Sequence, residues 1–233
     1  GDVMISNMPD EGLILAVDGP SGTGKSTTCR ALAKQLDAKY IDTGAMYRVA
    51  TLAVLRQGVD PADKEAVISA TANLPLEVSD DPDSTQVLFD GADVSRVIRE
   101  DEVTQNVSAV SAIPEVRENL VALQRTLAQR AHRAIVEGRD IGTVVLADAP
   151  AKAFMTASAE VRAQRRHDQN EKAGIASDFK SVLADVQRRD AADSSRATSP
   201  LRPADDATIV DTSDMSPEDV VQALINVVKE SRS

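Results

Sequence analysis

The chain has 233 residues, 42% of them hydrophobic, and a formal net charge of −11. This length and hydrophobic content suffice for a sizeable core, which excludes a chain that is disordered throughout. The acidic balance argues against nucleic acid as the main partner, because a phosphate backbone would be repelled.

The sequence carries no signal for secretion or membrane insertion. It has no run of about 18 apolar residues and no basic-then-apolar N-terminal pattern, so we expect a cytoplasmic protein with no membrane partner. The single cysteine, Cys29, cannot form an internal disulfide and is expected to fill the core in a reducing compartment. Residues 1–12 are polar and patternless, and we expect a flexible tail there.

A glycine-rich loop follows the first apolar run, Leu13 to Val17, which is closed by Asp18. The loop fits G-x-x-x-x-G-K-[ST] at every fixed position, and a helix is predicted over 27–36, so the strand–loop–helix context of a P-loop is present. Lys25 is expected to reach the β- and γ-phosphates of a nucleoside triphosphate, and the Ser26 hydroxyl to ligate Mg²⁺. The predicted phosphate-binding residues are Gly19, Pro20, Ser21, Gly22, Thr23, Gly24, Lys25, Ser26 and Thr27.

The next segments predict a parallel sheet with an insertion. A strand at 38–41, a turn and a helix to Leu55 complete a βαβ start, which implies parallel strands. Residues 60–100 are predicted to form an inserted subdomain, with a short helix at 61–72 and an antiparallel element at 74–94. Helices are predicted over 101–112 and 114–130.

The last third of the chain predicts further strands and a helical lid. Residues 133–142 give a short strand that ends in a charged turn, and strands are also expected at 152–156 and 208–211. Helices are predicted over 159–173, over 177–192 and from Pro217 to about Lys229, and Asp190 to Arg196 is expected to be polar and mobile. The predicted class is α/β, a doubly wound parallel sheet with helices on both faces, in one domain over 13–233 with a lid at 160–197.

Phosphate binding alone does not define the reaction. The guanine-specifying Asn/Thr-Lys-x-Asp run of a GTPase is absent, and the apolar-then-acidic run of a motor ATPase is short here, Ala134 to Glu137. Transfer to a small acceptor needs a second anion site and arginines that cover the transferred group. Arg48 and Arg139 are expected at the carboxyl ends of parallel strands, where ligands bind in this architecture.

Basic residues cluster in the two helices predicted after residue 158. Such helices, joined by a polar loop with Gly174, suit a hinged lid that closes arginines over phosphates. Surface helices with i,i+4 pairs to Glu160, Asp185 and Asp190 explain the same residues equally well. The arginines concerned are Arg162, Arg165, Arg166, Arg188, Arg189 and Arg196.

Three further motifs accompany the P-loop. They are Asp-Thr-Gly-Ala-Met-Tyr-Arg at 42–48, Glu-Gly-Arg-Asp-Ile-Gly-Thr at 137–143 and Arg-Arg-Asp-x-x-Asp-x-x-Arg at 188–196. In this order the chain resembles the bacterial cytidylate kinases from about Leu13 to the C-terminus. The P-loop is generic, whereas the motifs at 42–48 and 137–143 are specific to that family.

The resemblance implies roles for the matching residues. Thr43 would contact the acceptor nucleotide and Tyr47 would lie beside its base. Cytosine offers an amino donor beside two acceptors, which a carboxylate, a guanidinium and a hydroxyl complement. By resemblance, Arg48, Arg139 and Arg196 hold the CMP phosphate, Ser108, Arg117 and Asp140 bind cytosine, Arg189 and Asp193 reach the ribose, Arg162 and Arg166 contact ATP, and Lys25, Arg139, Arg189 and Arg196 act in catalysis.

Two positions depart from the family pattern. Thr43 stands where many members have Ser, which keeps the hydroxyl and adds a methyl group. Glu137 stands where some have Asp, and it is a candidate Mg²⁺ ligand through water. Phosphate is itself a nucleophile at pH 7, so no histidine base is needed, and His132 and His167 are interpreted as structural or surface residues.

The sequence therefore predicts a monomeric nucleoside monophosphate kinase that transfers the γ-phosphoryl group of MgATP to CMP or dCMP. Two alternatives remain at this point. One is a P-loop kinase for another small acceptor, such as UMP or shikimate. The other is a nucleotide-binding regulator without catalysis, which the second phosphate pocket argues against.

Overall fold

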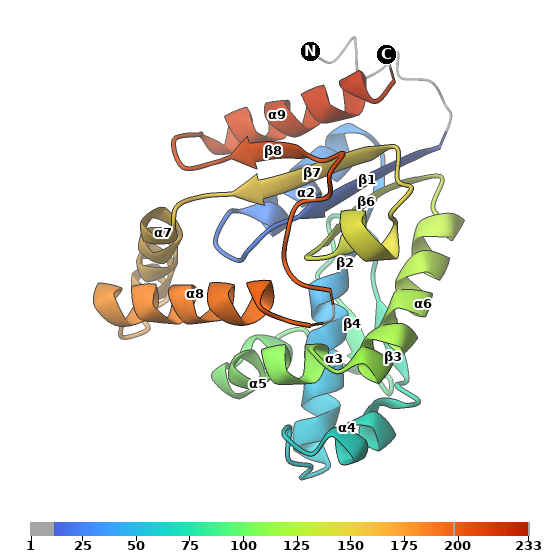
Figure 1. Cartoon of the computed structure of the whole chain (residues 1–233), viewed down its shortest axis with the longest axis vertical. Coiled ribbons are helices and arrows are strands. Elements are labelled where there is room, and N and C mark those ends of the chain that lie inside the picture. Colours follow the sequence, from blue (N-terminus) through green and yellow to red (C-terminus); the bar gives the residue numbers. More distant parts are fainter. Residues whose placement is uncertain (1–11, 198, 233) are drawn as a thin grey trace. The chain divides into compact units, whose positions relative to one another are not determined.

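The computed structural model describes residues 12–197 and 199–232 (Figure 1). Chain contacts divide the protein into two compact units. The first unit comprises Gly1–Leu13 and Ala33–Glu137, and the second comprises Ile14–Leu32 and Gly138–Ser233. The tail predicted over 1–12 lies, apart from Gly12, outside the described residues.

In the second unit, parallel strands carry the P-loop and the C-terminal helix. Ala16 of β1 pairs with Lys152 of β7, and Phe154 of β7 pairs with Ile209 of β8. The unbroken burial of β1 from Leu15 to Asp18 explains its apolar sequence. The elements are β1 (Leu13–Asp18), α2 (Lys25–Gln35), β7 (Ala151–Thr156), β8 (Thr208–Asp211) and α9 (Pro217–Glu230).

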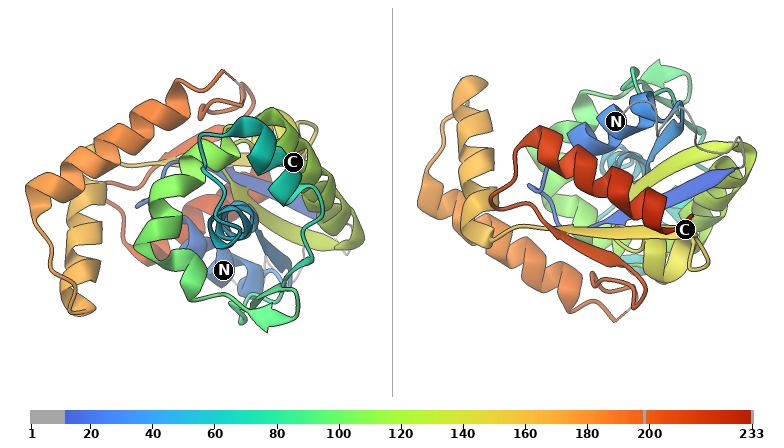
Figure 2. Two further views of the ribbon diagram at one scale, coloured as in Figure 1. Left: turned by 90° about the horizontal axis from the view of Figure 1, so that it is seen from below. Right: turned by 90° about the horizontal axis from the view of Figure 1, so that it is seen from above.

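Helix α9 lies across β7 and β8 (Figure 2). It begins with a capping box, in which the Ser216 hydroxyl accepts from the Asp219 N–H at 3.1 Å and the Asp219 carboxylate accepts from the Ser216 N–H at 3.2 Å. Pro217 occupies its first position, where a missing N–H costs nothing. The predicted C-terminal helix is therefore confirmed.

Residues 160–197, the predicted lid, contain most of two helices of the second unit, α7 (Ala159–Lys172) and α8 (Phe179–Ser194), which contact each other and run in different directions (Figure 2). Gly174 takes a φ of +73° in the turn between them. A small apolar cluster of Ala163, Val182 and Val186 joins the helices. Partly buried Ala159, Phe179 and Leu183 pack against this cluster.

The first unit contains the parallel pair β2 (Lys39–Asp42) and β6 (Arg133–Gly138), in which Tyr40 pairs with Ile135. Helix α3 (Thr43–Arg56) follows β2 without a break, and the Asp42 carboxylate caps it by accepting the Ala45 N–H at 3.2 Å. The turn expected at 42–44 is thus the cap and first turn of α3. The other helices of the unit are α4 (Lys64–Thr71), α5 (Asp101–Ser111) and α6 (Pro114–Arg130).

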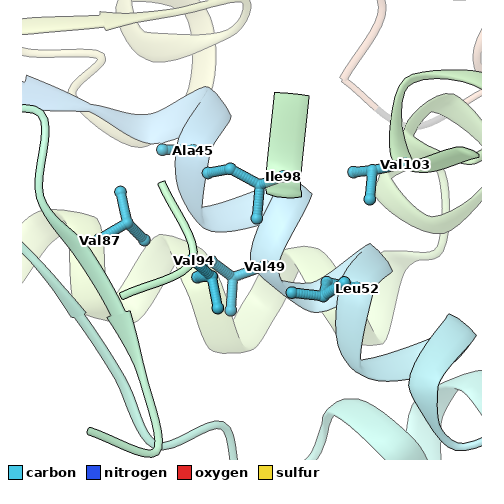
Figure 3. Packing of buried hydrophobic residues seen from close by; sticks show 7 residues of the cluster. All are labelled: Ala45, Val49, Leu52, Val87, Val94, Ile98 and Val103. Carbon is cyan, nitrogen blue, oxygen red and sulfur yellow. The ribbon is translucent and has the colours of Figure 1, made fainter. Parts of the chain in front are cut away.

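The antiparallel element of the first unit packs on α3. Its strands are β3 (Leu76–Val78), β4 (Val87–Phe89) and β5 (Ala92–Asp93), followed by the 3₁₀ turn η1 (Val97–Arg99). Figure 3 shows how side chains from these elements, α3 and α5 meet in one cluster, Ala45, Val49, Leu52, Val87, Val94, Ile98 and Val103. This cluster sets the position of α3 relative to η1 and α5.

The predicted α/β class with parallel strands is confirmed in both units, and Cys29 is buried as expected. The short strand that ends in a charged turn is confirmed as β6 and the bend after it, and residues 141–145 then form a π-helical turn, η2 (Ile141–Val145). One local expectation was wrong. Helix α8 continues to Ser194, so the region expected to be a mobile loop is mostly helical. Among the described helices, none is long and apolar enough to span a bilayer.

Candidate functional site

The P-loop of the second unit has the backbone that phosphate binding requires. Gly19 has a φ of +143°, and a Cβ there would lie 2.0 Å from the Met155 carbonyl oxygen, so only glycine fits. Gly22 has a φ of +84°, and a Cβ there would lie 2.9 Å from the Arg162 Cβ. The loop runs into the N-terminus of α2, whose first turn contains no acidic residue. This leaves the helix terminus favourable for an anion.

Lys25 is the first residue of α2, and its side chain is buried in the second unit, 8% exposed. Its ammonium donates to the Gly138 carbonyl oxygen at 3.1 Å and to the Gly19 carbonyl oxygen. The lysine thus links the start of the P-loop to the end of β6. Ser26 and Thr27, by contrast, are exposed on the first turn of α2.

Asp18, the last residue of β1, is the buried carboxylate beside the loop. Its two oxygens accept the N–H groups of Ile141 and Gly142, each at 2.8 Å. Burial raises the pKa of this carboxyl from 3.8 to about 6. The two N–H donors and the Lys25 charge lower the pKa by less than burial raises it, and the charge of Asp140 raises it further.

The two predicted site residues after β6 are placed differently in the second unit. The Arg139 guanidinium forms an ion pair with the Asp193 carboxylate of α8. Asp140 is buried, 3% exposed, and stands at the cap position of η2. The structure therefore brings Arg139 together with Asp193, two residues expected to contact the same nucleotide.

Arg162 of α7 is buried against the P-loop and α8. Its guanidinium makes two hydrogen bonds to the Asp190 carboxylate, at 2.9 and 2.5 Å, and a weaker one to the Ser21 carbonyl oxygen at 3.4 Å. On the same helix, Arg165 donates to the Gly22 carbonyl oxygen at 3.2 Å. Two arginines of the lid segment thus contact the P-loop backbone.

The remaining basic residues of the helix pair are distributed more loosely. Arg188 forms the surface ion pair that the alternative interpretation predicts, with Asp185 at 2.9 Å. Arg166 and Arg189 are half-buried on α7 and α8. Arg196 lies beyond the end of α8, and its guanidinium donates to the Ser199 carbonyl oxygen at 2.6 Å. The surface-helix interpretation therefore accounts for Arg188, and the hinged lid stays a prediction.

In the first unit, α3 carries the predicted acceptor residues of the 42–48 motif. The Thr43 hydroxyl donates to the Glu137 carbonyl oxygen at 2.7 Å. The Arg48 guanidinium donates to the Ile98 carbonyl oxygen at 2.9 Å and to the Thr104 hydroxyl at 2.8 Å. Arg48 was expected at a strand end, but it lies in the second turn of α3, because the helix begins directly after β2.

Arg117 and Tyr47 form a second group in the first unit. The Arg117 guanidinium carbon lies 5.1 Å from the centre of the Tyr47 ring, within cation–π range. The same guanidinium donates to the Ser111 carbonyl oxygen at 3.1 Å. Ser108 is half-buried one helical turn earlier on α5. The structure thus places Arg117 against α3 and α5, the helices that carry Tyr47 and Ser108.

Glu137, the candidate metal ligand, lies at the end of β6 in the first unit. Its carboxylate is buried and accepts a hydrogen bond from the Tyr40 hydroxyl. Within residues 12–197 and 199–232 no three His, Cys, Asp or Glu side chains gather as a metal site. This donor set fits a Mg²⁺ ion held mainly by substrate phosphates with few protein ligands.

Sequence reasoning gave no supporting role to Asp18 and Tyr40, and it named Arg165 and Asp190 only as members of the basic helix pair. A signal existed for Asp18, because an acidic residue at the end of a buried strand needs a partner. The contacts of Tyr40 with Glu137 and of Arg162 with Asp190 cross long sequence separations, which spacing does not reveal. With the loop, its lysine and arginines bound to carboxylates, the second unit has the features of a P-loop phosphotransferase.

The family model described as Cytidylate kinase matches residues 15–230. A cytidylate kinase from Corynebacterium glutamicum is 71% identical over 224 residues, which is 96% of this chain and 97% of the relative. One from Rhodococcus opacus is 60% identical over 223 residues, 96% of this chain and 97% of the relative. The chain belongs to the cytidylate kinase family and is a nucleoside monophosphate kinase.

A solved structure supports the fold. A gluconokinase from Sinorhizobium meliloti superposes with a TM-score of 0.51 at 16% identity, covering 97% of this chain and 96% of its own. At that identity the likeness concerns the fold alone. The predicted P-loop kinase fold is confirmed.

Proposed function

We propose that the chain transfers the γ-phosphoryl group of ATP to CMP or dCMP, giving ADP and CDP or dCDP. One observation carries the proposal furthest. The Lys25 ammonium, which would bind the donor phosphates, donates to the carbonyl oxygen of Gly138 at 3.1 Å. The next two residues, Arg139 and Asp140, are the expected contacts of the acceptor's phosphate and base, so donor and acceptor functions meet within the second unit.

Residues 19–27 would hold the ATP phosphates, with Arg162 and Arg166 as further contacts from α7. Phosphoryl transfer needs little covalent help from the protein, and catalysis is mostly positioning and charge neutralisation. Lys25, Arg139, Arg189 and Arg196 would supply that positive charge. The pairing of Arg139 with Asp193 supports this assignment, because it places a guanidinium and a ribose-binding carboxylate side by side.

Cytosine would be recognised by Ser108, Arg117 and Asp140. A hydroxyl, a guanidinium and a carboxylate complement its donor and acceptors, and a wrong base would leave a buried charge without a partner. Arg117 and Asp140 are buried, 5% and 3% exposed, which supports a strong energetic penalty for binding a wrong base. Thr43, Tyr47 and Arg48 would complete the acceptor site, with Arg48 and Arg196 on the phosphate and Arg189 and Asp193 on the ribose.

The metal would be Mg²⁺, held by the Ser26 hydroxyl and, through water, by the Glu137 carboxylate. When bound with ATP, such an ion neutralises charge on the phosphates that develops during transfer. The Tyr40 hydroxyl would fix the orientation of the Glu137 carboxylate, with which it forms a hydrogen bond.

The domain roles follow from the same proposal. Residues 60–100, which contain the antiparallel strands, would serve monophosphate binding, and residues 160–197 would act as the lid within one kinase domain over 13–233. We further propose a cytoplasmic monomer with no nucleic acid partner, in keeping with the net charge of −11.

A coupled assay of ADP release with MgATP tests the function. The acceptors are CMP, dCMP, UMP, AMP, GMP and shikimate. Turnover confined mainly to CMP and dCMP is expected. A preference for UMP or shikimate would indicate another small acceptor. Slow ATP hydrolysis that is indifferent to every acceptor would indicate a nucleotide-binding regulator.

A further inference from the structure

Arg165, in the second turn of α7, joins two segments of the second unit through its guanidinium. Its Nη1 donates to the Gly22 carbonyl oxygen at 3.2 Å and to the Thr212 hydroxyl at 3.1 Å. Its Nη2 donates to the Thr212 carbonyl oxygen at 2.7 Å. Nη1 carries two hydrogens, and both are used in this bridge. Arg165 thus connects the P-loop to the residue that follows β8.

Thr212 is a fixed anchor for this bridge. It is fully buried, and its N–H and its hydroxyl donate to the Thr156 carbonyl oxygen at the end of β7, at 2.7 and 3.1 Å. The hydroxyl of the next residue, Ser213, accepts the N–H of Ser158, the cap residue of α7, at 3.1 Å. The segment after β8 therefore holds both the start of α7 and the head group of Arg165.

The P-loop approaches α7 closely at the other end of the bridge. Gly22 has no room for a side chain, because a Cβ there would lie 2.9 Å from the Arg162 Cβ. The Arg162 guanidinium donates to the Ser21 carbonyl oxygen at 3.4 Å, beside the bond from Arg165 to the Gly22 carbonyl. Two successive carbonyl groups of the P-loop are thus directed toward arginines of α7.

The direction of each carbonyl also sets the direction of the next N–H group. A trans peptide unit is planar, and its C=O and N–H point in opposite directions. The Ser21 carbonyl shares a unit with the Gly22 N–H, and the Gly22 carbonyl shares one with the Thr23 N–H. These N–H groups therefore point away from the arginine head groups. Since P-loops bind phosphate oxygens through such N–H groups, a contact on the carbonyl side fixes donors on the phosphate side.

We infer that Arg165 is a positioning residue for the triphosphate: anchored on Thr212, it holds the peptide unit between Gly22 and Thr23 and so orients the Thr23 N–H toward the phosphates. This role rests on the proposed function, since it requires that the P-loop holds the phosphates of ATP. A hinged lid would instead close Arg165 over the phosphates. The acceptors of its guanidinium are protein oxygens, so its effect passes through the loop.

The test compares the KM for ATP with the KM for CMP in wild type, Arg165→Met, Arg165→Lys, Thr212→Val and the double variant Arg165→Met/Thr212→Val. Methionine keeps an unbranched side chain and removes every donor. Arg165→Met should raise the KM for ATP about 10-fold and change the KM for CMP less than about 2-fold. Lysine keeps the charge but lacks the planar fork that spans three acceptors, so the KM for ATP of Arg165→Lys should stay within about 3-fold of that of Arg165→Met.

The double variant shows whether Arg165 acts together with its anchor. Thr212→Val removes one acceptor of the bridge and should raise the KM for ATP about 3-fold. It should cause no further rise when Arg165 is already methionine. An unchanged KM for ATP in Arg165→Met, a wild-type value in Arg165→Lys, or an equal rise from Thr212→Val in both backgrounds would overturn the inference.

Inorganic tripolyphosphate separates the phosphates from the rest of ATP. As a competitive inhibitor against ATP at saturating CMP, it should bind about 10-fold more weakly to Arg165→Met, because it contacts the loop without a base or sugar. An unchanged inhibition constant, or no competition with ATP in wild type, would also overturn the inference. A wild type that transfers no phosphate to CMP would overturn the proposed function instead, and calorimetric titration of wild type and Arg165→Met with MgATP would then decide the role of Arg165.

Arg188→Met is the matched control. The Arg188 side chain lies on α8, is 69% exposed and pairs with Asp185, so its loss should leave both KM values at the wild-type level. Thermal unfolding of every variant shows that the compared proteins are folded. If Arg165→Met fails to fold, Arg165→Gln, which keeps a polar amide on a shorter stem, replaces it in the same comparison.

Discussion

The two units fix their arginines by different means. In the first unit, Arg48 and Arg117 donate to backbone carbonyls of η1 and α5, and these elements are set by the cluster around Ile98. In the second unit, Arg139 and Arg162 form ion pairs with carboxylates that both lie on α8. These two guanidiniums of the first unit therefore contact elements that an apolar cluster holds in place, whereas one helix carries the carboxylate partners of both guanidiniums of the second unit.

Because of this difference, the arginines of the two units should respond differently when the elements around them move. Ion pairs to Asp190 and Asp193, one helical turn apart, mean that a displacement of α8 affects both arginines at once. A rearrangement of the first unit's arginines requires repacking of an apolar core, which is costly. Variants in the first unit should therefore affect stability, and variants in the second should affect phosphate chemistry and lid geometry.

The largest expected effect is on transfer. Lys25→Ala should lower kcat by about 10³-fold or more, because the ammonium stabilises charge on the moving phosphoryl group. CMP binding, measured by calorimetry, should remain. Lys34→Ala is the matched control, since that side chain is half exposed and pairs with Asp83 at 2.7 Å. A loss of CMP binding as large as the loss of transfer would contradict separate donor and acceptor sites.

Truncation of a buried side chain should lower the free energy of unfolding more in the first unit's cluster than in the second unit's. Ile98→Ala removes a side chain of zero exposure from the first unit's cluster and should lower the free energy of unfolding by about 2–5 kcal/mol. Val186→Ala, in the smaller cluster between α7 and α8, should cost about 1–2 kcal/mol. Urea unfolding measures both. An equal or reversed order would break the comparison.

Acid titration should identify the buried carboxyl of the second unit. Because burial raises the pKa of Asp18 from 3.8 to about 6, the folded state binds a proton more tightly than the unfolded state. The resulting stabilisation is fully present below the unfolded pKa and is lost as pH rises through about 6.

The size of this effect follows from the same pKa. The unfolding free energy of wild type minus that of Asp18→Asn should fall by about 3 kcal/mol between roughly pH 3.5 and 7.5. The asparagine variant is uncharged throughout, so the difference isolates Asp18, with Lys25 and Asp140 as its charged neighbours. Urea unfolding across this range measures the difference, and a flat profile would be evidence against the raised pKa.

The smallest expected effect compares two carboxylates of α8. Asp190→Asn weakens the partner of the buried Arg162 guanidinium and should lower the unfolding free energy by about 1–3 kcal/mol, since a third of the Asp190 side chain is exposed. Asp185→Asn removes an exposed pair with Arg188 and should cost about 0–0.5 kcal/mol. Thermal unfolding of the two variants tests the order, and equal shifts would show that the Arg162 pair does not anchor the helices.

Much of the fold followed from local patterns in the sequence. Interactions between residues close together in the sequence specify three elements: the apolar run at Leu13 to Val17, the glycine loop and the Ser216–Pro217 cap. The end of α8 could not be predicted in this way. Asp190 and Asp193 favour helix ends by propensity, but they lie inside the helix, where Arg162 of α7 and Arg139, which follows β6, pair with them.

The sequence predicted the main residues of the candidate site but not the residues that hold them in place. Spacing and motif identify Lys25, Arg139 and Asp140, whereas the cap from Asp18 to Ile141 depends on strands that meet only in the folded unit. The π-helical turn η2 was not predicted, because no expectation was made for residues 143–145 after the charged turn. Hydrogen bonds between residues far apart in the chain leave no periodic pattern in the sequence from which they could be predicted.

The chain contains two tyrosines and no tryptophan, and both tyrosines belong to the first unit. The Tyr47 ring lies beneath the Arg117 guanidinium, and the Tyr40 hydroxyl donates to the Glu137 carboxylate. Tyrosine emission therefore comes from the first unit alone. The unlabelled protein carries its own optical reporter of the surroundings of these two side chains, which can be read in a cuvette or a stopped-flow cell.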